Sequence, residues 1–189
     1  DEKYIDELFL QINAHREKLR DPATGLWVHG WDGDNKNRCN LCGQTGWSNN
    51  DNKRSNEFWG RGNGWVVVTL AELVQTLPKD HPRRAEAEGL LKEMIVNLPK
   101  VQDKATGHWY QLPMRPDQAG NYIESSATAM FAYGILIAIQ EKIVEGEQYE
   151  NAVKIAYNGL RDHSIQSAGG SYLTVTNICK GTCIGDMEY

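Results

Sequence analysis

The chain has 189 residues, of which 40% are hydrophobic and 24% charged, a composition that supports a packed core and excludes a largely disordered protein. The net charge is −5 and no lysine or arginine cluster stands out, which argues against a nucleic-acid partner, because such a protein needs a basic face to neutralise phosphates. The longest apolar run, residues 127–139, is shorter than the roughly 18 residues of a membrane span, so we expect no membrane partner. The sequence opens on an amphipathic pattern, so we expect no signal peptide; bacterial cytoplasm and periplasm both stay open.

Hydrophobic periodicity predicts five helices along the chain. The first ends at Asp21-Pro22, because proline disfavours a helical conformation for the residue before it. The others are predicted at about residues 64–77, 83–101, 123–144 and 148–164. The fourth is apolar around most of its circumference, so we expect it to be buried on nearly all sides. A polar stretch at about 32–57 is predicted to be a long loop, and residues 169–176 alternate like a short strand or hairpin.

One short pattern occurs twice, each time after a predicted helix. Asp21-Pro-Ala-Thr-Gly25-Leu-Trp27 is repeated as Asp103-Lys-Ala-Thr-Gly107-His-Trp109, with a weaker third version at Gly169-Gly-Ser-Tyr172. Helical hairpins with equivalent loops predict a repeat architecture, either a solenoid or a closed toroid. The alternative is that the pattern is only favourable turn chemistry with glycine in a left-handed conformation.

Aromatic and polar residues concentrate in two stretches, 27–32 and 59–65. We expect all six tryptophans to lie outside the periodic helices or at their edges. Exposed indoles beside Arg, His, Asn and Asp suit a sugar, because the C–H face of the ring stacks on the indole while hydroxyls and carboxylates take hydrogen bonds and ion pairs. The alternative for each tryptophan is a loop anchor packed on the core, and for His29 it is a structural histidine.

Four stretches of the chain together resemble the unsaturated rhamnogalacturonyl hydrolases of glycoside hydrolase family 105, relatives of the family 88 unsaturated glucuronyl hydrolases. They are Leu26-Trp-Val-His-Gly-Trp-Asp32, Trp59-Gly-Arg-Gly-Asn-Gly-Trp65, Glu124-Ser-Ser-Ala-Thr-Ala-Met-Phe-Ala-Tyr-Gly134 and Thr182-Cys-Ile-Gly-Asp186. The second stretch is the most specific of them. Family members usually have alanine where this chain has Gly60, which is a mild departure.

The resemblance implies an all-α fold, an (α/α)6 barrel of helical hairpins, of which residues 1–189 cover the central to C-terminal portion. The remainder of its own polypeptide is therefore an expected partner. The implied reaction removes a 4,5-unsaturated uronic acid from the non-reducing end of lyase-generated oligosaccharides in pectin and rhamnogalacturonan breakdown. An aspartic acid protonates C4 of the vinyl ether and water adds at C5, which is general-acid catalysis without a metal or other cofactor. The family's sequence around that aspartate is not found in this chain, so we assign no catalytic residue here.

The substrate-binding positions implied by the resemblance are His29, Trp59, Arg61, Gly62 and Trp65. Arg61 would meet the uronate carboxylate or nearby hydroxyls, and the two indoles would stack on sugar rings. The resemblance does not decide between galacturonyl and glucuronyl substrates, or which sugar occupies the next subsite.

The chain's four cysteines form two close pairs, Cys39 with Cys42 and Cys179 with Cys183. Zinc sites with four cysteine ligands use similar spacings, although the second is one residue longer than the commonest zinc-binding spacing. Two disulfides or four thiols are the alternatives. The family resemblance implies no metal.

Two other functions fit parts of the sequence. One is a non-catalytic carbohydrate-binding or scaffold module of the same fold. The other is an inverting glycosidase of another α/α-toroid family, which would use a pair of carboxylates. The candidate carboxylates are those of Asp32, Glu57, Glu124 and Asp186.

Overall fold

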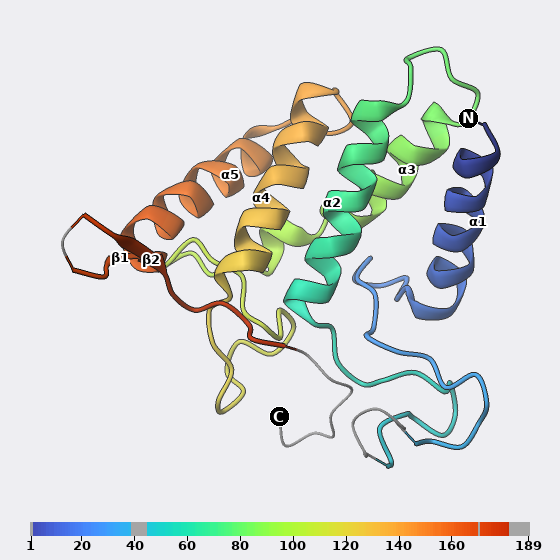
Figure 1. Ribbon diagram of the computed structural model, residues 1–189, viewed down its shortest axis with the longest axis horizontal. Helices are drawn as coiled ribbons and strands as arrows, with labels where there is room; N and C mark the ends of the chain where they lie inside the picture. The colour runs from blue at the N-terminus through green and yellow to red at the C-terminus, as the bar shows by residue number, and fades with distance from the viewer. Residues whose placement is uncertain (1, 39–44, 170, 182–189) are drawn as a thin grey trace. The chain divides into compact units, whose positions relative to one another are not determined.

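The computed structural model describes residues 2–38, 45–169 and 171–181, and most of its regular structure is helical (Figure 1). The chain divides into two compact units, one of residues 1–58 with 181–189 and one of residues 59–180. Within the described ranges, no helix combines the length and the apolar character that a membrane crossing requires.

The first unit opens with α1 (Glu2–Leu19), which ends just before Asp21-Pro22 as predicted. Its charges complement the helix dipole, with Glu2 in the first turn and basic residues in the last. Phe9 is fully buried on this helix.

The predicted long loop that follows α1 contains no helix or named strand in its described part, and polar contacts order it. Asp32 is buried, and its carboxylate accepts hydrogen bonds from the Asn37 amide (2.8 Å) and the Ser48 hydroxyl (3.3 Å). Asn37 in turn accepts a hydrogen bond from the Ser48 amide at 2.8 Å. Two isolated bridges, Trp31 with Arg54 and Ser48 with Ser55, bring the arms of the loop together. Its Asn- and Asp-rich composition therefore supplies the loop's own hydrogen-bond partners.

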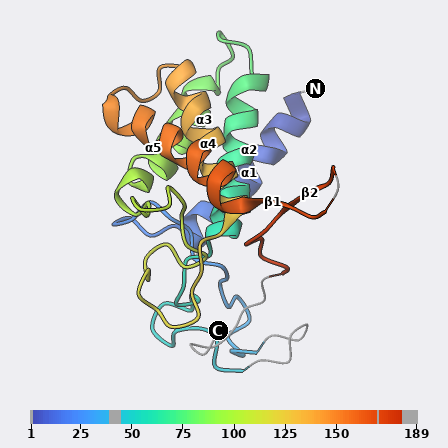
Figure 2. The same ribbon diagram turned by 90° about the vertical axis from the view of Figure 1, so that its left-hand side faces the viewer.

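The second unit contains the other helices and one hairpin. Its elements are α2 (Gly60–Thr76), α3 (Arg84–Ile95), η1 (Leu98–Lys100), α4 (Ser125–Gln140), α5 (Glu147–Gly159), η2 (Leu160–Ser164), β1 (Ile165–Ser167) and β2 (Leu173–Val175). Helix α4 packs against α2, α3 and α5, and Figure 1 shows it between α2 and α5. Strands β1 and β2 pair antiparallel beside η2, at the C-terminal end of α5 (Figure 2). The range 169–176, predicted as a short strand or hairpin, contains β2 and the turn with Gly169, whereas β1 lies before it at 165–167.

Three predicted helices are shorter than expected. The one expected over 83–101 divides into α3 and η1, because Pro99 lacks the amide hydrogen that would continue an α-helix. The one expected over 123–144 is α4 and ends at Gln140, and the one expected over 148–164 changes to the wider turn of η2 after Gly159. Helix α4 is also not buried on nearly all sides, since Leu136 is 40% exposed.

The core of this unit forms where α2 and α4 approach each other closely. A Cβ atom on Gly134 would overlap the side chain of Val67, so glycine allows the two helices to meet. Trp109 and Phe131 are also fully buried in this unit, and their rings meet edge to face at 5.5 Å.

Both Asp-x-Ala-Thr-Gly segments form the same turn. Asp21 Oδ2 accepts hydrogen bonds from the amide (2.8 Å) and the hydroxyl (2.7 Å) of Thr24, and Asp103 Oδ2 accepts the same pair from Thr106 (2.9 and 2.5 Å). The glycine that ends each segment has a φ of 77° or 75°. Partial burial raises the pKa of both aspartates, but the hydrogen bonds from threonine outweigh it and hold each pKa below its usual value. The repeated pattern is thus one structural unit used twice.

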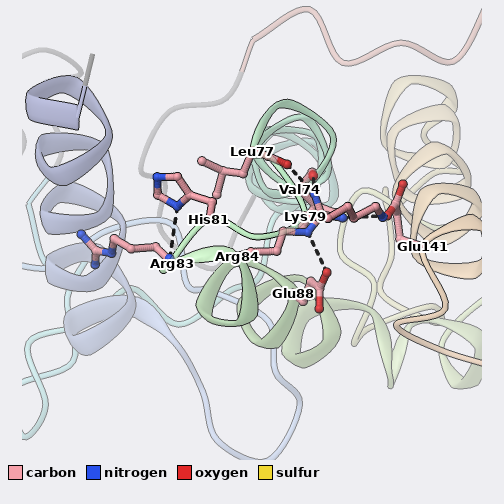
Figure 3. A network of polar contacts seen from close by, with 8 residues as sticks. All are labelled: Val74, Leu77, Lys79, His81, Arg83, Arg84, Glu88 and Glu141. Atoms are coloured by element: carbon pink, nitrogen blue, oxygen red, sulfur yellow. Dashed lines mark hydrogen bonds and ion pairs between the residues drawn. The ribbon is translucent and has the colours of Figure 1, made fainter.

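A buried arginine joins the ends of three helices, as Figure 3 shows. Arg84 is 5% exposed, and its Nη1 donates to the carbonyl oxygens of Val74 and, at 2.8 Å, of Leu77, where α2 ends. Its Nε donates to Glu88 at 2.7 Å, and its Nη2 donates to Glu141, just after α4, at 2.6 Å. Unpaired carbonyls at a helix end need such donors.

Candidate functional site

The glycine-rich stretch 59–65 forms the start of a helix, where the sequence predicted a loop and a helix beginning near residue 64. Helix α2 begins at Gly60, so Arg61 is helical and Trp65 lies inside the helix rather than at its edge. The cause is a tertiary contact, since the Gly60 amide donates to the Gln111 carbonyl at 2.7 Å. A Cβ atom on Gly60 would lie 2.7 Å from the carbonyl oxygen of Tyr110, so glycine permits this approach.

Arg61 and Trp65 lie one turn apart on α2, a spacing that places two side chains on one side of a helix. Trp65 is 57% exposed. Arg61 is half-buried, and its Nη1 donates to the carbonyl oxygen of Cys179. Within residues 2–38, 45–169 and 171–181, no carboxylate forms an ion pair with Arg61. This turn therefore combines a cation and an open indole face, which are the groups that an acidic sugar requires.

Most of the tryptophans are buried, contrary to the expectation of exposed indoles. The exposed fractions are 8% for Trp27, 6% for Trp47, 4% for Trp59 and 0% for Trp109, against 43% for Trp31 and 57% for Trp65. Packing such a large apolar side chain against other residues lowers the free energy more than leaving it exposed to water. Four of the six tryptophans are therefore buried, as expected for the alternative in which a tryptophan anchors a loop on the core. Trp59 precedes α2 directly, and Gly62 is half-buried in its first turn.

In the first unit, His29 lines a cavity of about 370 Å³ together with residues of α1 and the following loop. Lys18 Nζ lies 5.1 Å from the ring centre of Trp31, and both residues line the same cavity. Burial lowers the pKa of His29, so the neutral imidazole predominates at neutral pH. A neutral imidazole can both donate and accept a hydrogen bond, which suits a sugar hydroxyl.

The carboxylates of Glu124 and Asp32 are committed to structural hydrogen bonds. Glu124 is fully buried at the N-cap of α4, and its oxygens accept from the amides of Ser126 (3.3 Å), Ala127 and Cys179 (2.9 Å) and from the Ser126 hydroxyl (2.8 Å). Asp32 organises its own loop, as described above. Of the other two candidates, Glu57 is half-buried and Asp186 lies outside the described residues.

Cys179 is 3% exposed, and its Sγ accepts a hydrogen bond from Gln111 Nε2 at 3.3 Å. The other three cysteines, at positions 39, 42 and 183, lie outside the described residues, so the choice among zinc, disulfides and thiols stays untested. The part of the chain that the structure describes contains no group of three or more His, Cys, Asp or Glu side chains that could hold a metal ion.

The sequence pointed to neither Gln111 nor Cys179 as a neighbour of Arg61. Gln111 lies between two predicted helices and Cys179 in the C-terminal tail, and no local pattern connects them to residue 61, which is 118 positions from Cys179. Only the packed structure brings them together.

The sequence matches the family described as Glycosyl Hydrolase Family 88 along residues 1–189. The unsaturated rhamnogalacturonyl hydrolase YesR of Bacillus subtilis is 30% identical over 135 residues, which cover 71% of this chain and 34% of YesR. Protein Atu3128 of Agrobacterium fabrum is 32% identical over 156 residues, which cover 82% of this chain and 62% of that protein. A solved family 105 glycoside hydrolase of Clostridium acetobutylicum superposes with a TM-score of 0.84 and 30% identity, over 99% of this chain and 49% of that one.

The chain thus spans between about a third and about two thirds of the length of these relatives. The likeness confirms the expected fold class, a helical chain that covers part of an (α/α)6 barrel, and the resemblance drawn from the motifs. Because the match runs through all 189 residues, the chain belongs to glycosyl hydrolase family 88.

Proposed function

We propose that this chain is part of the catalytic domain of a glycoside hydrolase that acts on oligosaccharides ending in a 4,5-unsaturated uronic acid, as lyases leave them. The names of its relatives support this substrate, since YesR is an unsaturated rhamnogalacturonyl hydrolase. The observation that carries the proposal is the pairing of Arg61 with the exposed indole of Trp65 on one turn of α2.

In this proposal Arg61 binds the uronate carboxylate. A guanidinium has five N–H donors, so the hydrogen bond to Cys179 leaves others for a planar carboxylate. Trp65 stacks on the apolar face of a sugar ring. The buried Trp59 and the small Gly62 belong to the same turn of the second unit. Within the first unit, His29 is proposed separately as a binding residue, because its neutral imidazole suits a sugar hydroxyl.

The proposed reaction is hydration of the vinyl ether, in which an aspartic acid protonates C4 and water adds to C5. The resulting hemiketal then opens, and the next sugar is released with a free hydroxyl group. Glu124 and Asp32 do not fit the role of proton donor, because each is buried and accepts several structural hydrogen bonds. Because the family's sequence around its catalytic aspartate is also not found in residues 1–189, we propose that the acid comes from another part of the polypeptide. The remainder of the polypeptide would then be required for turnover, while Arg61 and Trp65 serve binding.

Binding and turnover by the full polypeptide test this function. An unsaturated disaccharide should bind and lose the ultraviolet absorbance of its conjugated double bond on incubation, whereas its saturated counterpart should not be cleaved. Binding without loss of absorbance would favour a non-catalytic carbohydrate-binding module. Cleavage of the saturated sugar would favour an ordinary inverting glycosidase.

Arg61→Ala should weaken binding of the unsaturated disaccharide by about 2–3 kcal/mol, roughly 30- to 150-fold, because it removes a charge-assisted contact. Isothermal titration calorimetry measures the affinity, and circular dichroism checks the fold. Lys154→Ala, at an exposed position of α5, is the matched control for loss of one positive charge. Equal affinities of Arg61→Ala and the control would remove Arg61 from the site.

A further inference from the structure

We propose that Glu124 is a positioning residue for Arg61 and acts on it through the backbone of Cys179. The inference rests on the proposed function, in which Arg61 binds the carboxylate of the sugar. It assigns a role in ligand binding to a fully buried carboxylate that does not itself touch the ligand.

Cys179 is fixed at three different atoms by side chains from three separate segments. Its amide donates to Glu124 Oε1 at 2.9 Å, its carbonyl oxygen accepts from Arg61 Nη1, and its Sγ accepts from Gln111 Nε2 at 3.3 Å. The residue is 3% exposed, so water does not compete for these groups. The Cys179 carbonyl accepts from the Arg61 guanidinium, and the hydrogen bond from the Cys179 amide to Glu124 holds the same residue in place.

The residues before Cys179 are attached to the same end of α4. The Ser125 amide donates to the Asn177 carbonyl at 2.8 Å, and the Ser125 hydroxyl donates to the Thr176 carbonyl at 2.7 Å. The segment 176–179 therefore follows the N-terminus of α4 as one strap, and Glu124 forms its last attachment, next to Arg61.

Glutamate is not among the preferred N-cap residues, so capping of α4 alone does not explain its presence at position 124. Serine, threonine, aspartate and asparagine are the preferred N-cap residues, because their short side chains reach the first amides of the helix. The Glu124 carboxylate accepts from the amides of Ser126 and Ala127 as a cap does, and its Oε1 also reaches the Cys179 amide, 55 positions away. The longer side chain accounts for this additional contact.

The consequence for Arg61 is a restricted side chain. A long, flexible arginine loses rotamer freedom when it binds a ligand, and a contact that restricts it beforehand lowers that cost. With its Nη1 on a fixed carbonyl, the guanidinium presents its remaining donors in one orientation. Glu124 thereby sets the affinity for the carboxylate without contacting it.

Glu124→Asp separates capping from positioning, because aspartate is a good N-cap residue but is too short to keep both contacts. In the full polypeptide we expect affinity for the unsaturated disaccharide to fall by about tenfold, as for loss of a hydrogen bond that supports a charged group. Glu124→Gln keeps the length and one acceptor oxygen for the Cys179 amide, but its –NH2 group would face the donating Ala127 amide, so it should restore part of the affinity and bind more tightly than Glu124→Asp. Thr128→Val is the matched control, since it removes buried hydrogen bonds of the same helix turn, to Trp109 and to the Glu124 carbonyl, without touching Cys179.

A double-mutant cycle distinguishes positioning from general destabilisation. In an Arg61→Ala background, Glu124→Asp should cause no further loss of affinity for the disaccharide. Glu124→Asp should likewise not change the affinity for a disaccharide whose carboxylate has been reduced to an alcohol. An equal loss in that background, or for the neutral sugar, would show a merely structural role and overturn the inference.

A second readout needs no ligand. The rate at which a thiol reagent labels Cys179, followed by peptide mass spectrometry, should rise about tenfold or more in Glu124→Asp and stay unchanged in Thr128→Val. An unchanged rate in Glu124→Asp would overturn the inference even if the sugar binds. Failure of the wild-type polypeptide to bind the sugar would instead refute the proposed function. The labelling rate of Cys179 would still test the contact between Glu124 and Cys179 in that case.

Discussion

Replacement of Arg84 by methionine should destabilise the second unit by about 3 kcal/mol, because removing one partner of a buried ion pair typically costs about 3–5 kcal/mol. We place the loss at the lower end for two reasons. Water reaches part of each partner carboxylate, since the side chain of Glu141 is 19% exposed and that of Glu88 is 35% exposed. Methionine also keeps much of the apolar contact of the arginine stem. What remains is the loss of donors to the carbonyls of Val74 and Leu77 at the end of α2.

Thermal unfolding followed by circular dichroism, together with urea titration, measures this loss. At about 2–4 °C per kcal/mol for a chain of this size, the midpoint should fall by roughly 6–12 °C. Arg161→Met is the matched control, because Arg161 pairs with Asp162 on the surface, where both side chains are at least half exposed, and should leave the midpoint unchanged. If Arg84→Met also leaves the midpoint unchanged, the network in Figure 3 does not stabilise the helix ends and the reasoning is refuted.

Two further predictions concern the turn at residues 103–107. Gly159→Ala should destabilise the protein by about 1–3 kcal/mol in urea titration, because its Cβ would overlap the Thr106 carbonyl oxygen, whereas Gly89→Ala, with open space around it on α3, should stabilise it by about 0.5–1 kcal/mol. A stabilising Gly159→Ala would contradict this contact. The pKa of Asp103 is lower in the folded state, so its contribution to stability is complete above the usual aspartate pKa and is lost as the pH falls through the lowered value. The unfolding free energy of Asp103→Asn should therefore fall less steeply on acidification than that of the wild type, and parallel pH profiles would refute the assignment.

Local structure could be predicted from the sequence where the interacting residues are close neighbours in the chain. The end of α1 before Pro22 follows from the proline ring, and the two Asp-x-Ala-Thr-Gly turns follow from a carboxylate and a threonine three residues apart. The family motif around Arg61 could be recognised in the same way, because a contiguous stretch carries it.

The start of α2 at Gly60 could not be predicted from the sequence, because the low helix propensity of Gly60 and Gly62 favours a loop. Helix formation there depends on the Gln111 carbonyl that accepts from the Gly60 amide, which is a long-range contact. The burial of Trp47 and Trp59 has the same origin, since burial depends on which segments pack over a side chain.

The sequence by itself determined the helical class, the repeated turn and the family, because each depends on spacing within a short segment. Only the tertiary structure decided that Glu124 caps a helix and reaches the Cys179 amide, and that the Cys179 carbonyl receives Arg61. These partners lie 55 and 118 positions apart, and no local pattern selects one partner among the many possible at that distance. Packing selects it, because a buried carbonyl left without a donor costs about 1–3 kcal/mol, and a carboxylate more, which is a large part of a total stability of about 5–15 kcal/mol.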